Sequence, residues 1–394
     1  MHFRLLFLLL ILIRPALAQR VVLPTLHNNP AGELQVYREN LALLRQEHPT
    51  HRELPNLKFF LFGMGDRLKL IYRNGRLLNA LTGNIEEQWQ VTQEIIVPSA
   101  YLVHLVLADG QIVQIQEDET GVWLLQPNKR PKLIPGTRSR VNLPRFAGKR
   151  FGPVLRVLHQ EILINVIHGR PVPNFLVYQK PRYRDAASMA MVLRQTNNLM
   201  LIHDWIMAIH DPFDRNNNDI LDADNPGEVL FLVSLVSDKT HPVVQMVLNS
   251  IRQFEKDNYI AGKSDNTEHP VYQTKWFKYG LKSLNLPDRY SIPKQYDSYS
   301  SLVWWAYTHD HVEGKKFSED SGLNYPYLSW AEDHFYAGNR GFIGTLDYPL
   351  SWEQHADNAH YPGLTVLDKD LVKQKLAFPQ AWHAAEMFLL LEKQ

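Results

Sequence analysis

The spacing of hydrophobic residues changes near the middle of the chain, and this change constrains the fold more than any other feature. From residue 57 to residue 126 the apolar stretches are short and broken by turns, as in "KLIYRNGRLLNAL" and "YLVHLVLADGQIVQI". Asn74-Gly75 and Asp109-Gly110 supply the positive φ angles that tight hairpin turns need. Residues 57–126 are therefore predicted to form a small antiparallel β domain.

Beyond residue 150 the hydrophobic period becomes helical. Segments such as "VLRVLHQEILINVI", "AASMAMVLRQT" and "PVVQMVLNSIRQF" place apolar residues three and four apart. Short loops separate these segments, and consecutive helices joined by short loops pack antiparallel. Residues 150–394 are therefore predicted to be an array of helical hairpins. Residues 127–149, rich in Pro, Gly and basic residues, should be a linker, and residues 19–56 a helical lead-in.

The N-terminus has the pattern of a secretory signal peptide. A basic start is followed by the apolar run "LLFLLLILI" and by Ala16-Leu17-Ala18, a small-x-small cleavage site. This run is far shorter than the roughly 20 residues that a membrane-spanning helix needs. We expect residues 1–18 to be removed, no membrane span to remain, and the protein to be exported to the periplasm or the medium.

The composition argues against several functional classes. The chain has no cysteine, which excludes disulfides, thiolate nucleophiles and cysteine metal sites. The 42 basic and 41 acidic residues nearly cancel, so we expect no nucleic-acid partner. No phosphate-binding glycine loop is present, and no third ligand accompanies His383 and Glu386. We therefore expect no cofactor and no metal, while the oligomeric state is not predicted by any of these features.

The loop "DPFDRNNNDILDADNPGE" (211–228) has three interpretations. Its oxygen-bearing side chains, counted from Asp214, are spaced as in a calcium-binding loop, but Asp219 and Asn225 occupy the positions that need glycine and glutamate. Asn225 and Glu228 fit a helix N-cap with a reciprocal capping glutamate. Neither interpretation uses Asp224, which precedes a helix start where negative charge is favoured. Asp224 is therefore a candidate catalytic carboxylate.

Arg184 and Asp185 open an apolar helix in "KPRYRDAASMAMVL". An adjacent Arg and Asp can clamp the vicinal hydroxyls of a sugar, because one side chain donates hydrogen bonds and the other accepts them. The alternative is an ion pair that closes the helix end. Both interpretations stay open.

A polar and aromatic cluster lies in "SDNTEHPVYQTKWFKYGL" (264–281). Two of its aromatic residues, 272 and 276, are four apart and so share a helix face. Phe277 and Leu281 should bury the opposite face, which would leave the polar face to line a cleft. The predicted substrate-binding residues of this segment are Glu268, His269, Tyr272, Gln273, Lys275 and Trp276.

Tryptophans recur beside carboxylates in the C-terminal part of the chain, in "LSWAEDHF" (328–335), "PLSWEQHADNAHY" (349–361) and "FPQAWHAAEMF" (378–388). Aromatic rings stack on the C–H faces of sugars, while carboxylates accept hydrogen bonds from hydroxyls. The alternative is a set of core aromatics with solvated loop charges. The predicted substrate-binding residues of these motifs are Trp330, Trp352 and His383.

Together, "YRDAASMAMVL", "DNPGEVLFLVSLV", "HPVYQTKWFKYGL", "YPLSWEQHA" and "WHAAEMFLLL" resemble, in their order along the chain, an exported bacterial family of the six-hairpin glycosidase kind. The resemblance covers about residues 50–394. It implies a mainly α fold: a complete or incomplete (α/α)6 toroid of helical hairpins, preceded by a small antiparallel β domain. It also implies acid and base carboxylates on loops around the funnel, with Arg184 and Asp185 holding the terminal sugar.

Hydrolysis of a glycosidic bond in an oligo- or polysaccharide is the leading functional hypothesis. One carboxyl must donate a proton to the leaving oxygen, and a second must activate water or attack the sugar. Burial beside Trp352 would raise the pKa of Glu353, which suits the acid. Asp224, before a helix start, suits the base, although the two roles could be exchanged. Asp333 is a reserve, and the resemblance favours inversion of configuration.

Two other functions stay open. A polysaccharide lyase would use Tyr272, His269 or His334 to abstract a proton and Arg184 to neutralise a uronate. A non-catalytic glycan-binding or polysaccharide-export accessory protein would use the same aromatic residues without turnover.

Overall fold

The fold is taken from a computed structural model, which describes residues 23–47, 59–176, 178–216, 218–264, 267–293 and 381–393. Two antiparallel sheets form the first part of it, and within each sheet the strands neighbour one another in chain order. The first sheet consists of β1 (Phe59–Phe62), β2 (Leu70–Arg73), β3 (Arg76–Asn79) and β4 (Ile85–Gln88). The second consists of β5 (Val91–Val97), β6 (Leu102–Leu107), β7 (Ile112–Glu117), β8 (Val122–Leu125) and β9 (Lys132–Leu133).

Local turn chemistry sets the register of the predicted hairpins. Asn74 and Gly75, with φ of 46° and 71°, connect β2 to β3, and Gly110, with φ of 77°, lies in the turn from β6 to β7. The side chain of Asp109 accepts a hydrogen bond of 3.0 Å from the N–H of Gln111, which tightens the second turn. Both predicted hairpins are confirmed.

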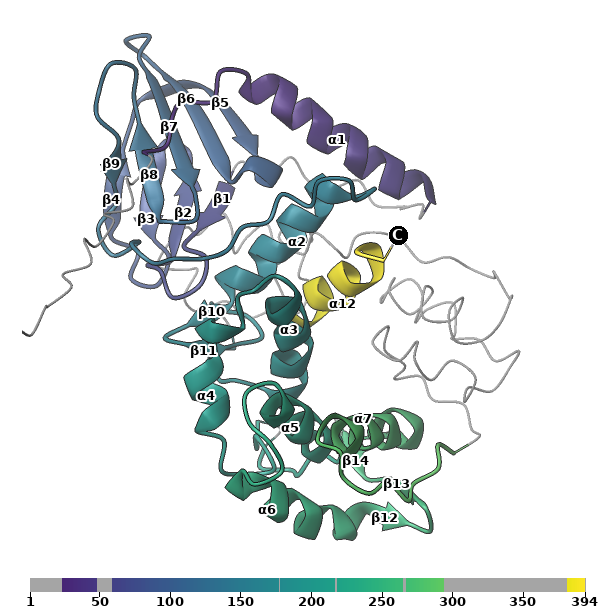
Figure 1. The fold of residues 1–394 in the computed structure, drawn as a ribbon. Coiled ribbons are helices and arrows are strands. Elements are labelled where there is room, and N and C mark those ends of the chain that lie inside the picture. Colours follow the sequence, from purple (N-terminus) through teal and green to yellow (C-terminus); the bar gives the residue numbers. More distant parts are fainter. Residues whose placement is uncertain are drawn as a thin grey trace, which may run out of the picture.

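Two helices cover the sheets on the side that faces the rest of the molecule (Figure 1). Helix α1 (Pro30–Glu47) packs beside β5, and α2 (Gly152–Ile164) is buried along almost its whole length. Leu163 accepts a hydrogen bond of 2.9 Å from the N–H of Gly65, and Gln160 donates one of 2.7 Å to the carbonyl of Leu61. These bonds fix α2 against the first sheet.

A 3-10 turn at Pro98–Ala100 joins β5 to β6. Beyond α2 the described part of the chain consists of short helices and two-stranded hairpins. Its helices are α3 (Tyr183–Gln195), α4 (His203–Met207), α5 (Asn225–Ser234), α6 (Pro242–Ser250), α7 (Pro270–Ser283) and α12 (Ala381–Leu391), with 3-10 turns at Leu199–Leu201 and Ile251–Phe254. The hairpins pair β10 (Val166–Ile167) with β11 (Arg170–Pro171), β12 (Glu255–Lys256) with β13 (Tyr259–Ile260), and β14 (Lys263–Ser264) with β15 (Thr267–Glu268).

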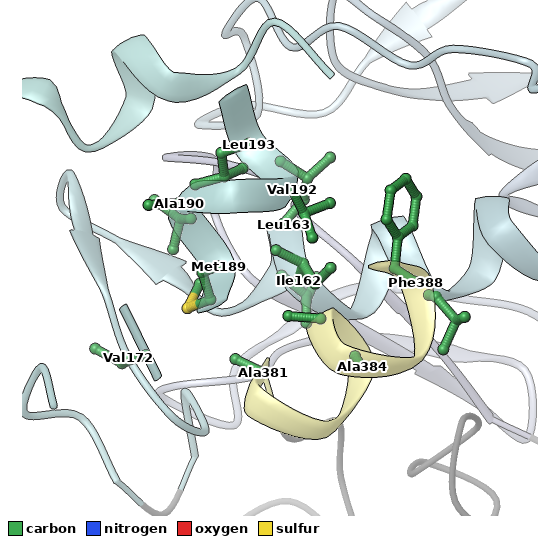
Figure 2. Close-up of a cluster of buried hydrophobic side chains, with 14 of the residues drawn as sticks. Ile162, Leu163, Val172, Met189, Ala190, Val192, Leu193, Ala381, Ala384 and Phe388 are labelled. Atoms are coloured by element: carbon green, nitrogen blue, oxygen red, sulfur yellow. The ribbon is translucent and has the colours of Figure 1, made fainter. Parts of the chain in front are cut away.

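Helix α12 lies against α2 and α3, although it comes almost two hundred residues after them in the chain. Figure 2 shows Ala381 and Ala384 on the face of α12 that turns toward Ile162 and Met189, with Phe388 one turn further on. Burying such apolar side chains contributes roughly 25 cal/mol per Å² of surface removed from water. The small alanines let the helices approach closely.

Helices α5 and α7 meet at two glycines. A Cβ atom at Gly227 would lie 2.4 Å from the backbone nitrogen of Phe277, and one at Gly280 would lie 2.6 Å from the carbonyl oxygen of Gly227. No side chain fits between the two backbones at this crossing. The close approach brings the first turn of α5, with its carboxyl groups, against the second half of α7.

The prediction of a mainly α toroid is wrong. The structure is 37% helix and 21% strand, with several antiparallel sheets in a mixed α/β arrangement. The most extensive helix contacts in the described part also join non-successive helices, since α5 packs mainly on α3 and α7, and α12 packs on α2 and α3. Helical periodicity showed which segments are helices, but not which helices pack together or that short hairpins interrupt them.

In the described part of the chain, no helix combines the length and the apolar character that crossing a membrane requires.

Candidate functional site

Asp224 is the centre of a buried polar cluster between α3 and α7. Its Oδ2 accepts hydrogen bonds from Nε and Nη2 of Arg184, at 2.9 and 2.8 Å, and its Oδ1 accepts one of 2.6 Å from Ser264 Oγ. Asp224 is 0% exposed, so this carboxylate is balanced by protein groups rather than by water. Removing one partner of such a buried pair leaves an uncompensated charge, which is strongly unfavourable.

The helix start at this site differs by one residue from the predicted one. Asp224, rather than Asn225, occupies the N-cap position of α5, and its side chain makes no capping hydrogen bond. Asn225 instead donates a hydrogen bond of 3.1 Å to Glu228 Oε2 and accepts one of 3.1 Å from the N–H of Asp214. The predicted reciprocal cap between Asn225 and the helix start is therefore wrong in detail. The carboxylate of Asp224 makes no capping bond and binds Arg184 instead.

Glu228, in the first turn of α5, is a buried carboxyl that favours its protonated form. Burial raises its pKa well above the usual value, and the charge of Asp224 and a hydrogen bond to the Asp224 side chain raise it further. Its Oε1 accepts no hydrogen bond from the described residues. Two carboxyls can share a hydrogen bond only if one carries a proton, so Glu228 is the acid and Asp224 the carboxylate of this pair.

A chain of hydrogen bonds from α7 holds Ser264 in place. The side-chain amide of Gln273 donates a hydrogen bond of 2.9 Å to Ser264 Oγ and one of 2.8 Å to the carbonyl of Gly262. Its Oε1 accepts a hydrogen bond of 3.1 Å from the N–H of Gly262. Gln273 was predicted to bind substrate. In the structure it clamps the segment before β14, so that Ser264 can donate to Asp224.

Asp214 accepts backbone hydrogen bonds that organise the loop before α5. Its Oδ2 accepts a hydrogen bond of 2.8 Å from the N–H of Tyr183, and its Oδ1 accepts one of 2.9 Å from the N–H of Asn216. Burial raises its pKa. Throughout the described ranges, no group of three or more His, Asp or Glu side chains is placed to hold a metal ion.

Arg184 and Asp185 lie in the first turn of α3 and are both buried, but they differ in their partners and in their protonation. Arg184 is bonded to Asp224, and its guanidinium carbon lies 6.0 Å from the ring centroid of Tyr272. Burial raises the pKa of Asp185 to about 6, while Arg182 and Arg184 counter part of that rise. Asp185 therefore titrates close to neutral pH, which is unusual for an aspartate.

The predicted aromatic platform on α7 lies in the core. Tyr272 and Trp276 are at most 2% exposed, their ring centroids are 6.5 Å apart, and the rings are nearly perpendicular. Lys275 between them is buried as well. The helix is therefore covered on the face that was expected to line a cleft, as well as on the face of Phe277 and Leu281.

Two further residues of this segment lie at its edge. Glu268, in β15, is exposed and forms an ion pair of 3.0 Å with Lys256. His269 occupies the N-cap position of α7 and is buried.

Four predicted site residues lie outside the described residues: Trp330, Asp333, Trp352 and Glu353. A fifth, His383, is part of α12, but its side chain is not among those described. The structure therefore brings together Arg184, Asp224 and Gln273 from the predicted set.

The cluster also contains residues that sequence reasoning missed. Glu228 was explained as a cap and Asp214 as part of a calcium pattern, while Ser264 was not considered. A signal for Glu228 was available, because it is the one charged residue in "NPGEVLFLVS", a helix buried along almost its whole length. Ser264 offers no such signal.

Comparisons of the chain with family models, with curated proteins and with solved structures find no match. They leave the resemblance to six-hairpin glycosidases untested. The geometry of the Asp224 cluster is therefore the basis on which a function can be proposed.

Proposed function

We propose that the protein is an exported carbohydrate-active enzyme that hydrolyses glycosidic bonds. The observation that carries this proposal is the Asp224–Glu228 pair, in which a carboxylate bonded to Arg184 adjoins a carboxyl whose pKa is raised well above the usual value. Neighbouring carboxyls that are driven to opposite protonation states are typical of acid–base sites.

The pair acts as one unit in this proposal. Carboxyls that flank a scissile glycosidic bond stand about 5 Å apart in retaining enzymes and roughly 6.5–9.5 Å apart in inverting ones. Asp224 and Glu228 are hydrogen-bonded, which is too close for either arrangement. Their shared proton makes Asp224 the base, and the acid comes from Glu353, with Asp333 in reserve.

The proposed reaction divides the proton transfers between the two sides of the bond. Asp224 takes a proton from water as the water oxygen attacks the anomeric carbon, while Glu353 gives its proton to the departing oxygen. Arg184 holds the Asp224 carboxylate in one orientation, and Glu228 offsets part of its charge by donating a hydrogen bond. Solvent then restores both protonation states, so the net change is hydrolysis.

The test is a screen of the purified protein against bacterial and plant polysaccharides, in which reducing ends and ultraviolet absorbance are both read. Asp224→Asn and Glu353→Gln should each lower turnover at least about 100-fold while glycan binding is retained, as expected on removal of a general acid or base. Asp204→Asn is the matched control, because Asp204 is exposed on α4. Circular dichroism should establish that each variant is folded at the assay temperature.

Full turnover in both variants would contradict the hydrolase proposal. An unsaturated product that absorbs in the ultraviolet would instead identify a lyase.

A non-catalytic glycan-binding role is the second candidate. It is favoured by the saturation of Asp224, whose carboxylate already accepts hydrogen bonds from Arg184 and Ser264. A carboxylate with its lone pairs occupied is a weak base. In that case no glycan would be turned over, and neither Asp224→Asn nor Glu353→Gln would change binding.

A further inference from the structure

Two hollows meet on the seam between the sheets and the helical part. The larger has a volume of about 1250 Å³ and lies between residues 23–27, the turn at 116–120 and the segment 138–145. The smaller, of about 350 Å³, lies between residues 140–142 and 197–201. Both are lined by Glu119 and Arg140, so they adjoin and form one trench.

The trench is larger than a typical small-molecule site, which has roughly 300–1,000 Å³. A hollow of this volume fits an extended ligand better than a single sugar or amino acid. None of the residues that line it belongs to the Asp224 cluster, so it is a separate site from the proposed catalytic group.

Three arginines along the trench are available to bind an anion. Arg138, Arg140 and Arg145 are exposed, and their guanidinium groups have no ion pair or hydrogen bond with any residue that the structure describes. A fourth arginine, Arg156, is held by other protein groups. It donates a hydrogen bond of 3.1 Å to the carbonyl of Pro144 and stacks on a tyrosine ring. The free guanidinium groups present planar donors that match carboxylates.

The acidic side chains of the trench cancel only part of the arginine charge. Glu117 is paired with Arg67 at 2.8 Å. The other three acidic residues of the lining have no arginine or lysine partner among the described residues: Glu33 bonds to His27 at 2.7 Å, Asp118 bonds to the indole N–H of Trp123 at 3.1 Å, and Glu119 is exposed. Against these three carboxyl groups stand the four arginines of the lining, at positions 138, 140, 145 and 156, which leaves an excess of one positive charge.

We propose that this trench binds a linear anionic polysaccharide, with sugar carboxylates paired to Arg138, Arg140 and Arg145. The smaller hollow, at one end of the trench, suits the uncharged parts of such a polymer. Met200 there is 76% exposed and offers an apolar contact for a sugar ring, and Asn197 offers an amide for hydroxyls. An acidic peptide shares the carboxylates but lacks the hydroxylated rings.

The test measures binding of the full chain to oligogalacturonate, to a neutral glucan of equal length and to poly-glutamate. All three titrations use the Glu353→Gln background, so that hydrolysis cannot consume the ligand and the buried Arg184–Asp224 pair stays intact. Oligogalacturonate should bind, the neutral glucan should not, and the affinity should fall as salt is raised. Binding in this background separates the trench from the proposed catalysis, since either can fail without the other.

A triple substitution decides whether the arginines are responsible. Replacing Arg138, Arg140 and Arg145 by Gln should weaken oligogalacturonate binding at least about tenfold, since three ion pairs with carboxylates are lost. The matched control replaces three exposed arginines elsewhere, at positions 130, 170 and 252, and removes the same net charge. It should bind as the parent does, and because all six side chains are exposed both variants should fold.

Three outcomes would overturn the proposal. The first is equal binding by the two triple variants, and the second is equal binding of neutral glucan and oligogalacturonate. The third is preferential binding of poly-glutamate, which would make the trench a site for acidic peptides.

Discussion

Replacing Glu228 by Gln is the most direct perturbation of the buried carboxyl pair. A glutamine keeps the shape of the protonated side chain: its oxygen can accept the hydrogen bond from Asn225, and its amide can donate to Asp224 in place of the carboxyl proton. It cannot ionise. The substitution therefore removes one titration from the folded protein and little else.

The sign of the effect follows from proton binding. Burial raises the pKa of Glu228 in the folded chain above its ordinary value of 4.5. Between these two values the native state binds more protons than the unfolded state, so the stability that Glu228 contributes is complete below pH 4.5 and is lost as pH rises. The slope for one such group is at most about 1.4 kcal/mol per pH unit. Glu228→Gln has no such loss.

The assay is urea denaturation of wild type and Glu228→Gln at pH 5, 6, 7 and 8. The variant should lie within about 1 kcal/mol of wild type at pH 5, because a carboxylic acid is exchanged for an amide of equal shape. It should then gain stability relative to wild type as the pH rises, until Glu228 ionises in the folded protein. Glu86→Gln, at an exposed position of β4, is the control and should show no such trend. Parallel curves, or a variant that is much less stable at pH 5, would refute a protonated Glu228.

Three other perturbations test separate parts of the structure. Asp224→Asn should reduce the free energy of unfolding by roughly 3–5 kcal/mol, measured by denaturation at pH 7, because it leaves the buried guanidinium of Arg184 without its charge partner. Burial lowers the pKa of Lys69 in the folded chain to about 7, from its ordinary value of 10.5. Between these two pH values Lys69 is protonated in the unfolded state but not in the folded state, so the stability of wild type relative to Lys69→Met should rise with pH across that range. A stability difference that does not change with pH would contradict this prediction. Gly227→Ala should lower the thermal midpoint, with a cost of about 1–3 kcal/mol, since its Cβ would meet the backbone of α7 at 2.4 Å; Gly32→Ala, whose Cβ meets only a movable asparagine side chain, should not.

The parts of the fold that were predictable are those that local chemistry determines. Asn74-Gly75 and Asp109-Gly110 specify turns by their own backbone preferences, so the hairpins followed from the sequence. Helix packing depends on partners far along the chain. Ala381 and Ala384 identify a helix with a small-residue face, but nothing near them indicates that α2 and α3 are the partners. The expected toroid relied on that missing information.

In the candidate site, too, local features could be predicted from the sequence and long-range contacts could not. Asp224 and Arg184 were each identified for their local setting, Asp224 as a base and Arg184 as a sugar clamp with its neighbour. The bond between them joins residues 40 positions apart, and it makes Arg184 a partner of Asp224 rather than a sugar clamp. Glu228 was assigned to a cap because its spacing from Asn225 matched one, whereas burial beside another carboxylate governs its chemistry. Burial and charge pairing are tertiary properties that spacing does not encode.

Stability and function make opposite demands on Glu228, and this contrast separates a structural role from a catalytic one. A carboxyl buried beside another carboxylate costs stability near neutral pH, whereas a glutamine would satisfy the same hydrogen bonds without that cost. If Glu228 only fills space, Glu228→Gln should be more stable and equally active. If its proton governs the basicity of Asp224, the variant should be more stable and the pH dependence of its turnover should change, because a carboxyl loses its proton at high pH and an amide does not. Only a catalytic role combines a gain in stability with an altered pH profile of turnover.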